Sequence, residues 1–436
     1  MPILRPLALV LATLCGLPGP ANTPVPATAT LESPLPGRAL WSIQASGGFP
    51  PFVLGEEALF IRKEEAVLRL GLADGAEAWS VPAEGVPVRE DGGLLFLVND
   101  KFELSCLDAL TGKLAWKTAM VKEGSASFGR GVLVVQGALK GPVVAGDKVL
   151  VGTFGGSLFK GRTGKLYAYD RRSGKLLWSF EAEDGLEHAP LIHQGRAIFG
   201  GVAACYAVDL ATGEQVWKAS TRSDNQWFFK IAGDTLLMSS GHYGAQKSSF
   251  GGTLYAFDVA TGAKRWQYDI GGPSVLQVAD GKVLGIEWGF LGGTRLTCLD
   301  LATGKPAWEF KEKSSSWPVV LDGKAMYLSK DNRIHLVDLA TGKAVSVPAS
   351  GDFRMGFFKG PWGRFLDPQA LHGRGVVGSW DKGKKETILQ ILDVRAGRVV
   401  QEQRVPGEVY RLWERQGLLG MLVEAGNDFT LQVLGR

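Results

Sequence analysis

The side chains best suited to metal binding or acid–base chemistry are few and scattered along the chain. The five histidines are His188, His193, His242, His335 and His372, and no two of them have the spacing that places two metal ligands on one element. His335 alternates with apolar residues, a pattern that favours packing in a core or an interface. The histidines therefore predict no metal site.

Cysteines and catalytic motifs are equally uninformative about an activity. Cys106, Cys205 and Cys298 lie in apolar segments without zinc-ligand spacing, so we interpret them as small buried hydrophobic residues. The chain contains no G-x-S-x-G, Walker A or H-E-x-x-H motif. Residues 373–378 match G-x-G-x-x-G, but they lie where a strand is expected and no helix follows, so we interpret the match as coincidental. The sequence thus predicts a protein that is not an enzyme.

Four segments are strongly basic: 117–140, 155–164, 241–252 and 347–364. They contain ten Lys and Arg and two acids, and ten minus two gives +8, compared with +4 for the whole chain. Aromatic residues lie among these cations, and a basic, aromatic surface suits an anionic partner. The plainer interpretation is a set of solvated loops with a few residues that cap the core. The residues predicted to form a partner-binding rim are Lys122, Arg130, Lys160, Arg162, Tyr243, Lys247, Arg354, Phe357, Lys359, Trp362 and Arg364.

These segments interrupt a repeat that positions them. Clear copies include LYAYDRRSGKLLW (Leu166–Trp178) and LYAFDVATGAKRW (Leu254–Trp266), and weaker copies bring the total to eight. In each copy alternating residues predict a strand, Asp or an equivalent residue nucleates a turn, and Gly supplies the positive φ that ends the turn. The turn glycines are Gly75, Gly112, Gly174, Gly213, Gly262, Gly304, Gly342 and Gly397.

The repeated Trp and Asp residues have a structural interpretation. Seven of the 13 Trp occupy the repeat position, and we predict that they pack between repeat units: Trp41, Trp79, Trp116, Trp178, Trp217, Trp266 and Trp308. The repeated Asp residues are predicted to form turns and not to act as catalytic carboxylates: Asp108, Asp170, Asp209, Asp258, Asp300, Asp338 and Asp393.

The repeat unit predicts the fold class. Two further short strands precede most copies, which gives four antiparallel strands per unit, the pattern of a propeller blade. Residues 37–41 resemble a last strand without its first three, and residues 409–434 resemble three strands without a fourth. We therefore predict an all-β, closed β-propeller whose N-terminal strand completes the C-terminal blade and removes the exposed edges. In such blades the connections that contain the four basic segments emerge on one face.

The N-terminal region predicts export. Residues 1–21 have the form of a signal peptide, with Arg5 followed by an apolar run, Leu7–Leu17, that is too short to span a bilayer. Residues 22–36 are rich in Pro, Ala and Thr and predict a flexible linker. Residues 37–436 then form a single domain. The expected location is the periplasm or another extracytoplasmic space.

Cys15 offers an alternative to a cleaved, soluble form. A lipid on this residue would tether the chain to a membrane. However, Leu14 stands where a lipobox has a small residue, so the sequence favours the soluble form.

The Asp-x-x-[Thr/Ser]-Gly-x-x-x-Trp repeat resembles that of the pyrroloquinoline-quinone (PQQ)-like repeat superfamily over nearly all of residues 37–436. This resemblance implies eight blades, the family norm, whereas the repeat count predicts nine. One branch, the quinoprotein dehydrogenases, binds PQQ and Ca²⁺ on the propeller axis, but its pair of adjacent cysteines is absent here and its acidic motifs are not recognisable. The other branch contains BamB and related exported scaffolds, which are not enzymes, and the chain is more similar to it.

The resemblance implies a non-catalytic, monomeric scaffold of the cell envelope without a cofactor, which presents its basic, aromatic face to a protein partner. A divergent PQQ-dependent dehydrogenase with calcium is an alternative, since PQQ is itself anionic. A binder of anionic envelope polymer or lipid headgroups is another. The net charge of +4 is too small to indicate nucleic-acid binding.

Overall fold

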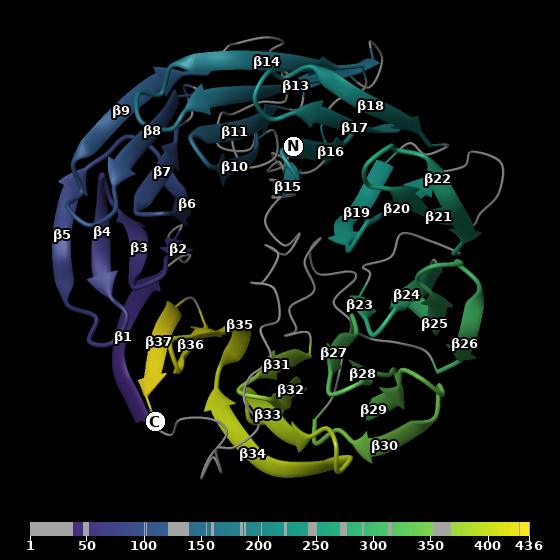
Figure 1. Ribbon diagram of the computed structural model, residues 1–436. Coiled ribbons are helices and arrows are strands. Elements are labelled where there is room, and N and C mark those ends of the chain that lie inside the picture. The colour runs from purple at the N-terminus through teal and green to yellow at the C-terminus, as the bar shows by residue number, and fades with distance from the viewer. Residues whose placement is uncertain are drawn as a thin grey trace, which may run out of the picture.

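The protein is an all-β ring in the residues that its computed structural model describes. These are residues 38–46, 52–99, 101, 103–120, 139–153, 155–157, 161–183, 186, 189–201, 203–221, 225–242, 251–270, 277–289, 292–312, 316–351, 368–426 and 428–435. The regular elements among them are 37 strands, β1 to β37. In Figure 1 they form separate sheets arranged around a ring, with the first strand of each sheet inside and the last strand outside.

Each of the first five sheets is a blade formed by consecutive strands. Blade 1 is β2 (Phe52–Leu54), β3 (Ala58–Lys63), β4 (Ala66–Gly71) and β5 (Glu77–Pro82). Blade 2 is β6 (Val86–Asp91), β7 (Leu94–Val98), β8 (Glu103–Asp108) and β9 (Leu114–Ala119). Blade 3 is β10 (Leu139–Ala145), β11 (Lys148–Thr153), β13 (Gly161–Asp170) and β14 (Leu176–Ala182), with the short β12 (Gly155–Ser157) also paired to β13. Blade 4 is β15 (Leu191–His193), β16 (Arg196–Gly200), β17 (Ala204–Asp209) and β18 (Gln215–Ser220). Blade 5 is β19 (Asn225–Ala232), β20 (Thr235–His242), β21 (Gly251–Asp258) and β22 (Lys264–Asp269).

The remaining sheets complete the ring. Blade 6 is β23 (Gln277–Ala279), β24 (Lys282–Gly289), β25 (Gly292–Asp300) and β26 (Pro306–Phe310). Blade 7 is β27 (Val319–Leu321), β28 (Lys324–Leu328), β29 (Arg333–Asp338) and β30 (Ala344–Pro348). Blade 8 is β31 (Gln369–Leu371), β32 (Arg374–Asp381), β33 (Glu386–Asp393) and β34 (Arg398–Pro406). Blade 9 is β35 (Glu408–Arg415), β36 (Leu418–Ala425), β37 (Asp428–Gly435) and β1 (Arg38–Ser46).

The structure confirms the predicted propeller and its mode of closure. The described residues form nine blades, the number given by the repeat count and one more than the family norm. The N-terminal β1 pairs antiparallel with the C-terminal β37, from Arg38 opposite Gly435 to Ser46 opposite Asp428. Closure in this way leaves no blade without its fourth strand.

The core lies between the blades. Successive residues of a strand face opposite neighbours, as β28 of blade 7 shows. Ala325 and Tyr327 pack toward blade 6, whereas Met326 and Leu328 pack toward blade 8. β28 therefore buries both of its faces, as an inner strand of a propeller blade does.

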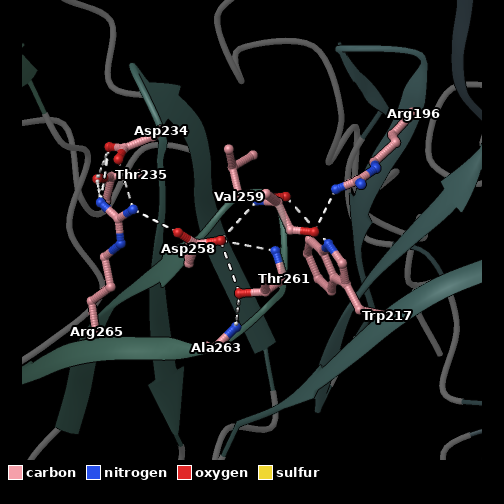
Figure 2. A network of polar contacts seen from close by, with 10 residues as sticks. Arg196, Trp217, Asp234, Thr235, Asp258, Val259, Thr261, Ala263 and Arg265 are labelled. Atoms are coloured by element: carbon pink, nitrogen blue, oxygen red, sulfur yellow. Dashed lines mark hydrogen bonds and ion pairs between the residues drawn. The ribbon is translucent and has the colours of Figure 1, made fainter.

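The repeated Asp forms the turn between the third and fourth strands. In blade 5 the Asp258 carboxylate accepts hydrogen bonds from Thr261 N and Oγ1 at 2.9 and 2.8 Å, and Gly262 N donates to Asp258 O at 2.8 Å. Figure 2 shows Arg265 joining this turn to Asp234 of the preceding turn; Arg265 Nη2 lies 2.6 Å from Asp258 Oδ2 and 2.7 Å from Asp234 Oδ2. The equivalent backbone hydrogen bonds occur in the other copies, so the predicted role of the repeated Asp residues in forming turns is confirmed.

The repeated Trp connects each turn to the preceding blade. Trp217 Nε1 donates a hydrogen bond to Val259 O at 3.2 Å, across the interface between blades 4 and 5 (Figure 2). Its indole lies against Gly262, where a Cβ atom would approach Trp217 Cδ2 to 2.7 Å. All seven predicted Trp residues make the equivalent indole hydrogen bond. They are confirmed as inter-blade packing residues, and the turn Gly leaves room for the indole as well as adopting a positive φ.

The turn of blade 5 predicts a defined acid sensitivity. The Arg265 guanidinium, together with the hydrogen bonds from Thr261, lowers the pKa of Asp258 to about 2. Because the folded-state pKa lies below that of the unfolded chain, the contribution to stability is complete above about pH 4 and is lost as the pH falls toward 2. We expect Asp258→Asn to be less stable than the wild type at pH 7, with a difference that shrinks below pH 4. Urea unfolding at several pH values, with Asp280→Asn as the control, measures this. A difference that stays constant from pH 7 to pH 3 would contradict it.

A close approach in blade 9 predicts a second stability effect. The Trp413 indole lies over Gly420, its cross-strand partner, and a Cβ atom there would lie 1.8 Å from Trp413 Cε2. We expect Gly420→Ala to lower the free energy of unfolding by about 1–3 kcal/mol, the usual range for overpacking. Gly383→Ala is the matched control, because the nearest atom to its Cβ would be Asp381 Oδ1 at 3.4 Å. Equal stability of the two variants in urea unfolding would refute the expected clash.

Candidate functional site

One face of the ring collects the connections that contain the four basic segments. These connections run from β9 to β10, from β11 to β13, from β20 to β21 and from β30 to β31. In an antiparallel blade the second-to-third connection and the connection to the next blade leave from the same end. The flanking strand ends thus lie on one face, which we call the insertion face, and the Asp–Gly turns lie on the opposite face.

The rim residues themselves fall mostly outside the described part of the chain. Arg162 belongs to β13, where it pairs with Gly156 of the short β12, so its backbone lies in a hairpin on the insertion face. The other ten lie outside the described residues: Lys122, Arg130, Lys160, Tyr243, Lys247, Arg354, Phe357, Lys359, Trp362 and Arg364. The partner-binding rim remains a prediction.

Ion pairs balance part of the insertion face at blade 2. Lys117 Nζ lies 2.8 Å from Glu103 Oε2 and 3.3 Å from Glu84 Oε2, and Lys101 Nζ lies 3.4 Å from the same Glu84 oxygen. The two lysines hold the pKa of the Glu84 carboxyl below its usual value. Lys117, one of the ten cations counted in the basic segments, therefore adds no net charge here. A positive charge on this face must come from residues other than this group of ion pairs.

Blade 8 contributes a basic hairpin to the same face, which the sequence analysis did not identify. Lys382, Lys384 and Lys385 are exposed in the turn between β32 and β33. At its base Arg404 lies 3.2 Å from Asp381 Oδ2 and 3.3 Å from Glu402 Oε1. The cationic tip is thus separated from a base whose charges are paired. The run Lys-Gly-Lys-Lys at residues 382–385 is the sequence feature that could have identified this basic hairpin.

A buried polar network lies in blade 7 and ends at the insertion face. His335 is 3% exposed. Its Nε2 lies 2.8 Å from Ser329 Oγ, and its Nδ1 lies 2.7 Å from Ser346 Oγ. Ser329 Oγ also donates to Asp331 Oδ1. Burial of the imidazole lowers the pKa of His335 below its usual value. The predicted interface position of His335 is confirmed, but its hydrogen-bonded neighbours were not anticipated from the sequence.

Two cations lie on the innermost strands. Lys230 belongs to β19 and Arg411 to β35, and burial lowers the pKa of each. The Arg411 guanidinium lies 5.6 Å from the centre of the Phe52 ring. The Arg411 residue as a whole is exposed, whereas the neighbouring protein desolvates its guanidinium group. Both cations therefore belong to strands at the inner side of the ring (Figure 1).

The three cysteines outside the N-terminal segment occupy the buried positions that their apolar surroundings predicted. Cys106, Cys205 and Cys298 are buried thiols, and burial raises the pKa of the Cys106 thiol to about 12. The G-x-G-x-x-G match lies in the turn before β32 and in that strand, without a following helix. Within the described ranges, no group of three His, Cys, Asp or Glu side chains could hold a metal ion. Those same residues include no apolar helix long enough to cross a membrane.

Fold and repeat together define a β-propeller of PQQ-like repeats. A family model described as outer membrane protein assembly factor BamB matches residues 63–158 and 131–347. The matched region, 63–347, comprises 285 of the 436 residues. The chain therefore belongs to the BamB family.

Curated relatives of the chain include alcohol dehydrogenases whose names refer to a quinone or a quinohemoprotein. The chain is 30% identical over 178 residues to the dehydrogenase subunit of a quinone-dependent alcohol dehydrogenase from Gluconacetobacter polyoxogenes, covering 36% of this chain and 22% of that protein. It is 26% identical over 121 residues to quinohemoprotein alcohol dehydrogenase ADH-IIG from Pseudomonas putida, covering 24% of this chain and 16% of that protein. The matches thus span about a fifth of the length of these relatives.

The solved structures similar to this chain include both BamB and dehydrogenases. The crystal structure of BamB from Moraxella catarrhalis has a TM-score of 0.48 and 18% identity, and the alignment covers 91% of this chain and 99% of that one. A europium-containing methanol dehydrogenase has a TM-score of 0.48 and 14% identity, with 92% and 93% covered. At this similarity the structures do not separate a scaffold from an enzyme.

Proposed function

We propose that the protein is a non-catalytic scaffold of the cell envelope that holds a protein partner on its insertion face. Membership in the BamB family is the observation that carries this proposal. The topology supports it, because the strand ends that flank all four basic segments lie on one face. A closed ring with buried inter-blade cores is a rigid support, which reduces the entropic cost of presenting loops to a partner.

The charge of the insertion segments indicates the chemistry of the partner. Their net +8 favours an acidic protein surface, and their aromatic residues can provide the anchors common at interface centres. The basic hairpin of blade 8 extends this surface. Such a protein partner would bury about 800 Å² of the face.

Charge reversal on the insertion face is the direct test. We expect Lys359→Glu combined with Arg364→Glu to reduce partner cross-linking in cells at least about tenfold, the effect of losing about 1.4 kcal/mol of binding free energy. Lys113→Glu with Lys343→Glu is the matched control, because both lysines are exposed on the Asp–Gly turn face. An unchanged set of cross-linked partners in the first variant would overturn the proposal. A captured polymer or lipid whose binding disappears at high salt would instead support the polymer-binding alternative.

A divergent PQQ-dependent dehydrogenase is the second candidate. Lys230 and Arg411 on the inner strands favour it, because they suit an anionic cofactor. The calcium of such enzymes does not fit the described residues, since no cluster of three acids or other ligand side chains occurs among them. Calorimetric titration with PQQ and Ca²⁺ distinguishes the candidates. Micromolar binding at one site would favour the enzyme, and the absence of heat would favour the scaffold.

A further inference from the structure

Blade 7 departs from the repeat at the fourth strand. Ser346 occupies the position, four residues after the turn Gly, that holds Trp in the preceding blades. The other seven blades with this turn have a register shift between the third and fourth strands, whereas the pairing of β29 with β30 has none. In consequence Val345 lies against Gly397 of blade 8, with 3.2 Å between Val345 Cγ1 and a Cβ atom built there. Ser346 faces the other side, opposite His335.

The hydrogen bonds around His335 fix where its proton lies. Ser329 Oγ has one proton, and both of its acceptors, Asp331 Oδ1 and Arg333 O, are groups that cannot donate. The Ser329 oxygen must therefore accept a hydrogen bond from His335 Nε2–H. Nδ1 of the neutral ring is then an unprotonated base, and it accepts the proton of Ser346 Oγ at 2.7 Å.

The surroundings hold this base in place and leave the hydroxyl within reach. The imidazole stacks on Tyr327, with 5.2 Å between ring centres, and meets the edge of Phe310 at 5.3 Å. Ser346 is only half-buried and lies on the outermost strand of the blade. Arg333 Nη2 donates a hydrogen bond to the backbone carbonyl oxygen of Ser346 at 3.2 Å, so a guanidinium lies at the main chain of this residue.

We propose that Ser346 is a base-activated nucleophile that accepts acyl or phosphonyl groups from small activated esters. His335 is the general base, Ser329 and Asp331 are positioning residues, and the Arg333 cation stabilises the negative charge that develops on the electrophile. These are the parts that nucleophilic catalysis requires. The proposal does not depend on the scaffold function, since it concerns blade 7 alone.

The reaction is a displacement at carbon or phosphorus. Ser346 Oγ forms a bond to the acyl carbon while the bond from that carbon to the leaving oxygen breaks. The hydroxyl proton passes to His335 Nδ1 and then to the departing oxygen. With a fluorophosphonate, the Oγ–P bond forms, the P–F bond breaks, fluoride leaves and the proton is released to solvent.

Labelling of the full chain with a fluorophosphonate tests this directly. We expect one adduct by intact mass, located on Ser346 by peptide mapping and absent from Ser346→Ala, whereas Ser350→Ala reacts like the wild type. His335→Gln should slow labelling about a hundredfold, the lower range for loss of a general base. Should that variant not fold, Asp331→Asn and Ser329→Ala on the adjoining turn provide the same comparison, with a smaller loss expected.

A pH profile separates catalysis from a purely structural histidine. The labelling rate should rise with pH through a midpoint below the usual pKa of histidine, because burial and Arg333 lower it while Asp331 and Glu312 raise it. Removing the Asp331 charge should move the midpoint to lower pH. A folded wild-type chain without an adduct on Ser346, or a rate unaffected by loss of His335, would overturn the proposal.

Discussion

Replacing Trp217 with Ala is expected to lower the free energy of unfolding by about 3–5 kcal/mol, the usual cost of removing a buried Trp. The side chain is 7% exposed and lies in the core between blades 4 and 5, with Met238 and Tyr255. The substitution would leave a cavity at this interface. It would also remove the indole hydrogen bond to Val259 O.

The effect can be separated from general loss of apolar surface. Leu114→Ala, on an outer strand where the side chain is 59% exposed, should change stability by less than about 0.5 kcal/mol. Urea unfolding followed by tryptophan fluorescence and by circular dichroism compares the variants. A loss below about 1 kcal/mol for Trp217→Ala would show that the repeated Trp residues do not hold the blades together.

The fold could be predicted because its periodic features are local. An alternating strand, an Asp–Gly turn and a second strand occupy about a dozen residues, and each part follows from backbone and side-chain preferences. The contact between Trp217 and Gly262 could not be predicted, since it joins two copies that no local pattern relates. The sequence predicted Gly at this position because the turn requires a positive φ. The structure shows a second reason, since the Trp indole of the preceding blade occupies the space that a Cβ atom would need.

Blade 7 shows where the repeat pattern fails. The copy at residues 334–346 was one of the weaker copies of the repeat, with Ser346 in place of Trp. Nothing in the sequence revealed that the register shift between β29 and β30 is missing. Between blades 7 and 8, Val345 lies against the turn Gly397, where the preceding blades have the Trp indole. Exchange of the two faces of β30 places a hydroxyl beside a buried imidazole. The polar network is thus a consequence of register, which depends on pairing with distant strands.

The charge of the insertion face was only partly accessible from sequence. Counting residues within the four segments gave +8, but Glu84 and Glu103, which pair with Lys117, lie outside those segments. Spatial neighbours from other strands therefore change the local balance. The rim prediction consequently depends on the insertion residues beyond Lys117, and charge reversal at Lys359 and Arg364 tests those residues.

Removing β1 should have the largest effect of all, because it opens the ring. Without residues 38–46, β37 loses one of its two antiparallel partners and exposes a backbone edge, and such edges promote aggregation. The core between blades 9 and 1 also loses Trp41 and Ile43, which pack against Leu431 and Val433. We expect a loss of at least about 5 kcal/mol from the combined loss of Trp burial and strand hydrogen bonds.

The experiment compares a chain that starts at residue 38 with one that starts at residue 47. Size-exclusion chromatography and thermal unfolding should show a folded monomer for the first and aggregated or unfolded protein for the second. A synthetic peptide of residues 38–46 added during refolding should restore the monomer, because the edge of β37 is its specific template. Rescue by this peptide, but not by one in which Trp41 is replaced by Ala, would assign closure to strand pairing and to the Trp41 contact with Gly75. A stable monomer that starts at residue 47 would instead mean that the eight complete blades hold the ring without their closing strand.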